Sequence, residues 1–96
     1  MNVLDINDFV TLIEKDILSS NDLPGSRQRL NALLEYVPSD DLDGLAIIHH
    51  LRYLVGLSYE IEGKPEEAVA AYLALVSDAP DSMFSWLALT RLAVSP

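Results

Sequence analysis

The chain has 96 residues, half of them hydrophobic, with 15 acidic residues, 6 lysines or arginines and no cysteine. This length and apolar content fit one small domain and exclude wholesale disorder, and the lack of cysteine excludes disulfides, zinc thiolates and thiol catalysis. The net charge of −9 argues against nucleic acid or an anionic membrane as the main partner and favours a basic or neutral protein surface, although acidic charge also simply keeps small proteins in solution.

The N-terminal segment is expected to enter a helix directly. Residues 1–8 contain no basic segment and no long apolar run, so they do not form a secretory signal, and a cytoplasmic location is expected. No stretch reaches the ~18 apolar residues of a membrane-spanning helix. The first helix is expected to begin near residues 5–7, where Asp5 and Asn7 offer capping oxygens. Its predicted apolar stripe comprises Ile6, Phe9, Val10, Ile13, Ile17 and Leu18.

A second helix follows the turn at residues 22–25. It is expected to run from about Pro24 or Ser26 to Tyr36, with Pro38 beyond its end. Arg27 and Arg29 are expected on its solvent side. Its predicted buried face comprises Leu30, Leu33, Leu34 and Val37.

Three more helices are expected after a loop that begins at Ser39. The third should cover about residues 43–62 and end at the sequence Gly63-Lys64-Pro65. The fourth should continue to Pro80, and the fifth, capped by Asp81 and Ser82, should cover about residues 81–93. No segment alternates with the period of a strand, so no sheet is expected.

Gly56 lies inside the third predicted helix, where glycine costs roughly 1 kcal/mol relative to alanine. Close approach of a neighbouring helix is the usual compensation. Ala68, a small residue in the fourth predicted helix, suggests that the third and fourth helices pack backbone to backbone as a hairpin.

Residues 52–80 contain a small residue, an aromatic residue, an alanine, a second aromatic residue and a proline at fixed spacing: Gly56, Tyr59, Ala68, Tyr72 and Pro80. In this pattern the segment resembles the tetratricopeptide repeat, a helix–turn–helix unit of about 34 residues. Two positions depart from the family pattern, because Arg52 replaces a tryptophan and Leu75 replaces a small residue. The family implies an all-α fold, here about five antiparallel helices in a right-handed α-α superhelix.

Weaker copies of this pattern flank the central repeat. An offset of 42 residues pairs Pro38 with Pro80, and the third helix is longer than the family's usual first helix. An offset of 34 pairs the third helix with the fifth: Arg52 with Trp86, Val55 with Leu89 and Gly56 with Thr90. We interpret residues 1–96 as one domain with a degenerate repeat at 7–40, a well-formed repeat at 49–82 and a capping helix at 83–94.

No arrangement of residues predicts catalysis or metal binding. His49 and His50 are adjacent, so on a helix they point about 100° apart and cannot hold one metal ion together. Residues 39–44 resemble the start of a calcium loop, but the twelfth position is His50 instead of the required glutamate. Helix capping explains those aspartates, and Glu66 and Glu67 fit the first turn of a helix. The chain is therefore predicted to be no enzyme and to use no cofactor.

The resemblance implies a partner-binding surface on the first helix of each repeat. The groove-lining family positions fall on Asp8, Thr11, Lys15 and Leu18 in the first repeat and on His50, Tyr53, Leu57 and Glu60 in the second. The fifth helix adds Phe84, Leu87 and Arg91. The predicted partner-binding residues are His50, Tyr53, Leu57, Glu60, Phe84, Leu87, Arg91 and Lys15.

Two functions remain open from the sequence. The first is a non-catalytic protein-interaction module that binds a peptide or helix through this surface, with no nucleic-acid or membrane partner. The second is a structural or oligomerisation unit. In so short an array, the apolar residues of the predicted surface would belong to the core, or would form the site where further repeats or another copy of the chain stack. The sequence names neither the partner nor the pathway, and it leaves the oligomeric state and the completeness of the chain open.

Overall fold

The computed structural model describes residues 3–94, which form five α-helices and no strand. The prediction of an all-α fold with about five helices is confirmed. The helices are α1 (Val3–Leu18), α2 (Leu23–Tyr36), α3 (Leu42–Glu62), α4 (Pro65–Asp78) and α5 (Met83–Val94).

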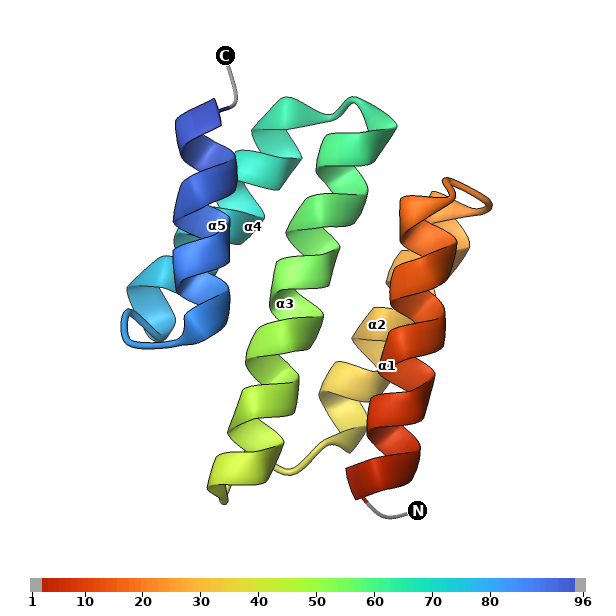
Figure 1. Ribbon diagram of the computed structural model, residues 1–96, viewed down its shortest axis with the longest axis vertical. Helices are drawn as coiled ribbons and strands as arrows, with labels where there is room; N and C mark the ends of the chain where they lie inside the picture. The colour runs from red at the N-terminus through yellow and green to blue at the C-terminus, as the bar shows by residue number, and fades with distance from the viewer. Residues whose placement is uncertain (1–2, 95–96) are drawn as a thin grey trace.

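The helices lie in two layers and alternate in direction along the chain (Figure 1). α1, α3 and α5 form the front layer in this view, and α2 and α4 lie behind them. Within the described residues, α3 is the only helix that contacts all four others. The arrangement therefore consists of two hairpins, α1–α2 and α3–α4, with α5 beside the second.

The starts of α2 and α3 follow from local capping, whereas α1 begins earlier than the sequence predicted. The Asp22 side chain accepts a hydrogen bond from the Gly25 N–H at 3.1 Å and so caps α2. Asp41 caps α3 in the same way, through the Gly44 N–H at 2.6 Å. α1 begins at Val3, so the expected start at residues 5–7 is wrong, and these residues lie inside the helix.

Glycine, proline and serine mark the end of α3 and the starts of α4 and α5. Gly63 terminates α3 with a φ of 83°, a left-handed conformation that glycine adopts without steric cost. Pro65 opens α4, where its missing N–H donor is not needed. Before α5, the Ser82 hydroxyl accepts a hydrogen bond from the Phe84 N–H at 3.1 Å. α5 consequently begins at Met83, slightly later than expected.

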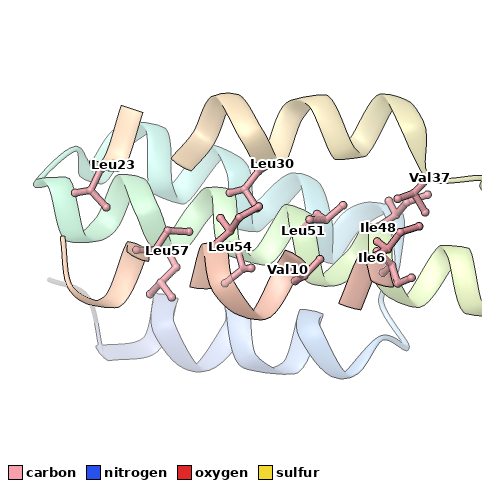
Figure 2. Close-up of a cluster of buried hydrophobic side chains, with 12 residues drawn as sticks. Ile6, Val10, Leu23, Leu30, Val37, Ile48, Leu51, Leu54 and Leu57 are labelled. Atoms are coloured by element: carbon pink, nitrogen blue, oxygen red, sulfur yellow. The ribbon is translucent and has the colours of Figure 1, made fainter. Parts of the chain in front are cut away.

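The core has two parts, and the first fills the space between α1, α2 and α3 (Figure 2). Its members recur every three or four residues along each helix, as expected for the buried face of an amphipathic helix. Phe9 and Leu18 were expected in this core but are 47% and 62% exposed, because they lie on the flanks of the α1 stripe. The buried residues of this cluster are Ile6, Val10, Ile13, Ile17, Leu23, Leu30, Val37, Ile47, Ile48, Leu51, Leu54 and Leu57.

The second part of the core joins α4 and α5 to α3. Three of its five buried members are alanines, and partly buried aromatic rings pack against it. The backbone-to-backbone packing of α3 and α4 that was expected at Gly56 is wrong. A Cβ atom on Gly56 would lie 2.5 Å from Cε1 of Tyr72, so the absent side chain makes room for this ring and not for a helix backbone. The buried members are Ala68, Tyr72, Leu75, Ala79 and Ala88.

Arg27 was expected on the solvent side of α2 but is only 8% exposed. Its guanidinium lies over the ring of Tyr59, 4.1 Å from the centroid, and donates to the Ser58 hydroxyl at 3.3 Å. It also donates to Glu62 Oε1 at 2.5 Å. A buried cation is tolerated when it is paired and hydrogen-bonded in this way, and Arg27 thereby ties α2 to the end of α3.

None of the helices in residues 3–94 combines the length and the apolar content that crossing a bilayer would require.

Candidate functional site

The predicted partner-binding residues lie on α1, α3 and α5, the three helices of the front layer (Figure 1). We call the surface that these helices form the front face. α3 contacts both α1 and α5 and therefore provides its floor.

Aromatic contacts hold α5 against α3 on this face. The His50 ring stacks on Phe84 with a centroid separation of 4.5 Å and an interplanar angle of 8°. Tyr53 lies 6.2 Å from Phe84 and 5.9 Å from Tyr72, both measured between centroids and with tilted rings. Such ring pairs are worth about 0.5–1.5 kcal/mol beyond the area they bury. Three of these rings, His50, Tyr53 and Phe84, were predicted from the sequence to bind a partner, whereas the contacts that they make here lie within the molecule.

A second contact between the same helices is centred on the Glu60 carboxylate. It accepts hydrogen bonds from Arg91 Nε at 3.0 Å and from the Tyr72 hydroxyl at 2.8 Å, and Arg91 Nη2 binds its other oxygen. The hydrogen bonds from Arg91 lower the pKa of Glu60 against the opposing effect of burial, and the Tyr72 bond lowers it further. Burial and the bond to Glu60 raise the pKa of Tyr72. Glu60 thus joins α3, α4 and α5.

The remaining predicted residues lie apart from these contacts. Leu57 is 7% exposed and belongs to the core between α1, α2 and α3. Leu87 is 40% exposed on α5. Lys15 is exposed on α1, and it is its neighbour Glu14 that reaches α3, with Oε1 3.7 Å from His50 Nε2.

An open depression of about 200 Å³ lies on the front face and is lined by residues of α1, α3 and α5. His50 and Phe84 were predicted from the sequence, but the other members were missed, because the family positions were counted from residue 49 and leave out the first two turns of α3. The expected extension of the third helix contained the signal, since Asp43, Ala46 and His50 follow helical spacing. The depression is lined by Asn7, Asp43, Ala46, Ile47, His50 and Phe84.

His50 and Asp43 are the titratable residues that line this depression. Burial lowers the pKa of His50 from the ordinary 6.5, and the nearby Glu14 carboxylate opposes part of that effect. The ring is therefore neutral at pH 7 and presents one donor and one acceptor nitrogen. Together with the Asn7 amide and the Asp43 carboxylate, it can bind a polar or cationic group, while Phe84 offers an apolar wall.

A larger concavity of about 440 Å³ lies on the opposite flank of α1, between α1 and α2. Its wall is almost entirely apolar, and the ion pair of Arg29 with Asp16, at 3.3 Å, lies beside it. We call it the α1/α2 edge. Sequence reasoning missed it because Phe9 was assigned to the core. The α1/α2 edge is lined by Phe9, Leu12, Ile13, Asp16, Arg29, Ala32 and Leu33.

Comparison with protein-family models, with curated proteins and with solved structures finds no match to this chain.

Proposed function

We propose that the protein is a non-catalytic interaction module of the tetratricopeptide-repeat type, whose front face binds a peptide or helix of a partner protein. The observation that carries the proposal is the open depression between α1, α3 and α5, whose lining includes His50 and Phe84. Grooves that bind peptides combine an apolar wall with a few polar groups, and this depression has that composition.

The charge distribution supports a partner segment that is basic or neutral. Five of the six cationic side chains already lie within 4 Å of an acidic partner: Arg27, Arg29, Arg52, Lys64 and Arg91. The depression itself carries Asp43, with Glu14 close by. Uncompensated charge is thus almost wholly negative, which repels nucleic acid and anionic membranes and attracts cations.

The aromatic and ionic contacts on the front face support a positioning role for part of the predicted set. Tyr53 and Glu60 of α3 contact residues of α5, and Arg91 of α5 binds Glu60. These contacts fix the position of α5 relative to α3. In this proposal they shape the depression, whereas His50 and Phe84 contact the partner together with Asn7 and Asp43.

Site-specific photo-cross-linking in cells tests the proposal and does not require the partner to be identified beforehand. A photoreactive residue at Ala46, exposed in the depression, is expected to trap a discrete protein partner. The matched control is the same residue at Gln28, exposed on α2 in the rear layer. Trapping of the same partner at Gln28 but not at Ala46 would remove the basis for a front-face site.

A second candidate function is supported by the α1/α2 edge. Phe9 and Leu12 are 47% and 57% exposed beside the 440 Å³ concavity, and apolar patches of this kind often mark association sites. A structural unit that self-associates would bury them. Sedimentation at increasing micromolar concentration tests this, and a monomer at every concentration argues against the second function without touching the first.

A further inference from the structure

Large apolar side chains are also exposed at the other end of the molecule, on α4 and α5. Trp86 is 69% exposed, Leu73 52%, Leu89 47% and Val69 36%. We call these four residues the α4/α5 edge. They take no part in the front face, and neither part of the core needs them there.

The four side chains lie on adjoining flanks of their helices. On α4, Ala71 and Ala74 face α2, so Val69 and Leu73 lie on the opposite flank at 100° per residue. On α5, Arg91 faces α3, and the Ser85 hydroxyl donates to the Ala79 carbonyl at 2.5 Å. Trp86 and Leu89 come next around α5, on the side of α4 and away from α3. The edge is therefore an apolar strip along two antiparallel helices that contact each other.

The internal repeat indicates what kind of element fits this strip. The offset of 34 residues pairs Arg52, Val55 and Gly56 of α3 with Trp86, Leu89 and Thr90 of α5. On α3 these three residues hold α4. Arg52 lies 3.8 Å from Asp78, Gly56 receives the ring of Tyr72, and Val55 lies beside Ala71 and Leu75. The side of α5 that corresponds to the α4-binding side of α3 is thus exposed to solvent.

The charges around the strip favour a partner helix that carries basic residues. α4 carries no lysine or arginine, and Arg91, the only cation of α5, is bound to Glu60. Glu66 and Asp81 are exposed near the two ends of the strip. A second copy of this chain offers a poor match, because five of its six cations are already paired and its net charge is −9. Like charges across an interface oppose association.

We propose that the α4/α5 edge is a second docking surface, which binds an amphipathic helix of a partner protein with basic residues flanking its apolar stripe. The helix lies along α5 as α4 lies along α3, and its apolar residues at i, i+3, i+4 and i+7 contact Leu73, Trp86 and Leu89. Trp86 is the central anchor, in line with the prominence of tryptophan in binding energetics. This inference is independent of the front-face site.

Trp86 is the only tryptophan in the chain, so its fluorescence reports directly on the strip. The probe is a synthetic amphipathic peptide of about 18 residues, long enough to form a helix, with lysine and arginine flanks and no aromatic residue. The matched control peptide keeps the apolar stripe and carries glutamate on its flanks. The basic peptide is expected to shift the emission of Trp86 to shorter wavelength in a saturable way that weakens with salt, and the acidic peptide to leave it unchanged.

Two variants locate the site. Leu89→Glu, at an exposed position of the strip, is expected to raise the Kd for the basic peptide at least about tenfold. Leu12→Glu, at the α1/α2 edge, is the matched control and should leave the Kd unchanged. Circular dichroism confirms that both variants fold.

Three results would overturn the proposal. The first is no shift of Trp86 emission with the basic peptide, or the same shift with both peptides. The second is an equal Kd for Leu89→Glu and the unaltered chain. The third is a Trp86 emission that shifts with protein concentration alone while sedimentation shows association, since a second copy would then cover the strip.

Discussion

Gly56 and Gly63 differ in what an added side chain would meet. Gly56 faces the ring of Tyr72, which is 2% exposed and cannot move aside, whereas a Cβ atom on Gly63 meets nothing within 4 Å. Gly56→Leu is therefore expected to lower the free energy of unfolding by about 3 kcal/mol or more, through overpacking. Gly63→Ala is expected to cost only about 1 kcal/mol, because of the left-handed backbone at that position.

Urea denaturation of the two glycine variants measures this difference. If Gly56→Leu were as stable as Gly63→Ala, the close contact of α3 with Tyr72 would be wrong.

Arg27 and Arg29 provide a second matched pair at the scale of single residues. Arg27 is buried and bonds Glu62 and Ser58, while the Arg29 and Asp16 side chains are 50% and 45% exposed. Arg27→Ala is expected to lower the free energy of unfolding by about 2 kcal/mol or more, because it removes buried bonds and packing over Tyr59. Arg29→Ala should cost less than about 1 kcal/mol. Similar urea midpoints for the two variants would contradict the burial of Arg27.

His50 makes stability depend on pH. Its folded-state pKa lies below the unfolded value of 6.5, so folding favours the neutral ring. The contribution is full above about pH 6.5 and is lost as the pH falls toward the folded-state pKa, because the unfolded chain takes up the proton first. The groups that face the ring are Glu14 on α1, Asp43 on α3 and the uncharged Phe84 on α5.

Glu14→Gln tests the electrostatic part of this prediction. Since the Glu14 carboxylate raises the pKa of His50, its removal should lower that pKa further. An NMR titration of the imidazole protons measures the change, with His50→Gln to assign the signal. An unchanged or higher His50 pKa in Glu14→Gln would show that the two side chains do not interact.

At the scale of elements, the position of α5 depends on the Glu60 carboxylate. Glu60→Gln is expected to lower the free energy of unfolding by about 1 kcal/mol, because Arg91 is 39% exposed and solvent screens its ion pair. A double-mutant cycle with Arg91→Met isolates the pair. Asp78→Asn, which alters the exposed pair with Arg52, is the control and should have little effect.

The same contact predicts a loss of stability in acid. The folded-state pKa of Glu60 lies below its ordinary value of 4.5, so the stabilisation is present above that value and disappears as the pH falls through the lower folded-state pKa. The decrease should be smaller in Glu60→Gln when unfolding is followed between about pH 5 and pH 3. An identical decrease in the variant would mean that Glu60 is not charge-paired.

At the scale of the molecule, local signals predicted most of the helix pattern. The turns at residues 22–25 and 63–65, the aspartates within residues 39–44 and the helical spacing of apolar residues identified five helices, because each signal acts within one or two turns. The start of α1 was wrong because Asp5 and Asn7 are compatible with both a cap and a helix interior.

The sequence could not show which side of each helix would be buried and which would face solvent. Arg27 was assigned to solvent because its partners, Ser58 and Glu62, come from a helix more than 30 residues away. Phe9 was assigned to the core, although only part of the apolar surface of α1 is buried and Phe9 lies outside that part. Asn7 and Asp43 line the same depression only because α1 packs against α3. Long-range packing decides these positions, and no local pattern records it.

The affinity of the cross-linked partner for two arginine variants tests the front-face proposal most directly. Ala46→Arg fills the depression and places a cation beside Asp43, whereas Gln28→Arg adds the same charge to α2 in the rear layer. By titration calorimetry, Ala46→Arg is expected to raise the Kd at least about tenfold, which corresponds to ~1.4 kcal/mol, and Gln28→Arg to leave it unchanged. Equal affinities for the unaltered chain and Ala46→Arg would contradict partner binding at the front face.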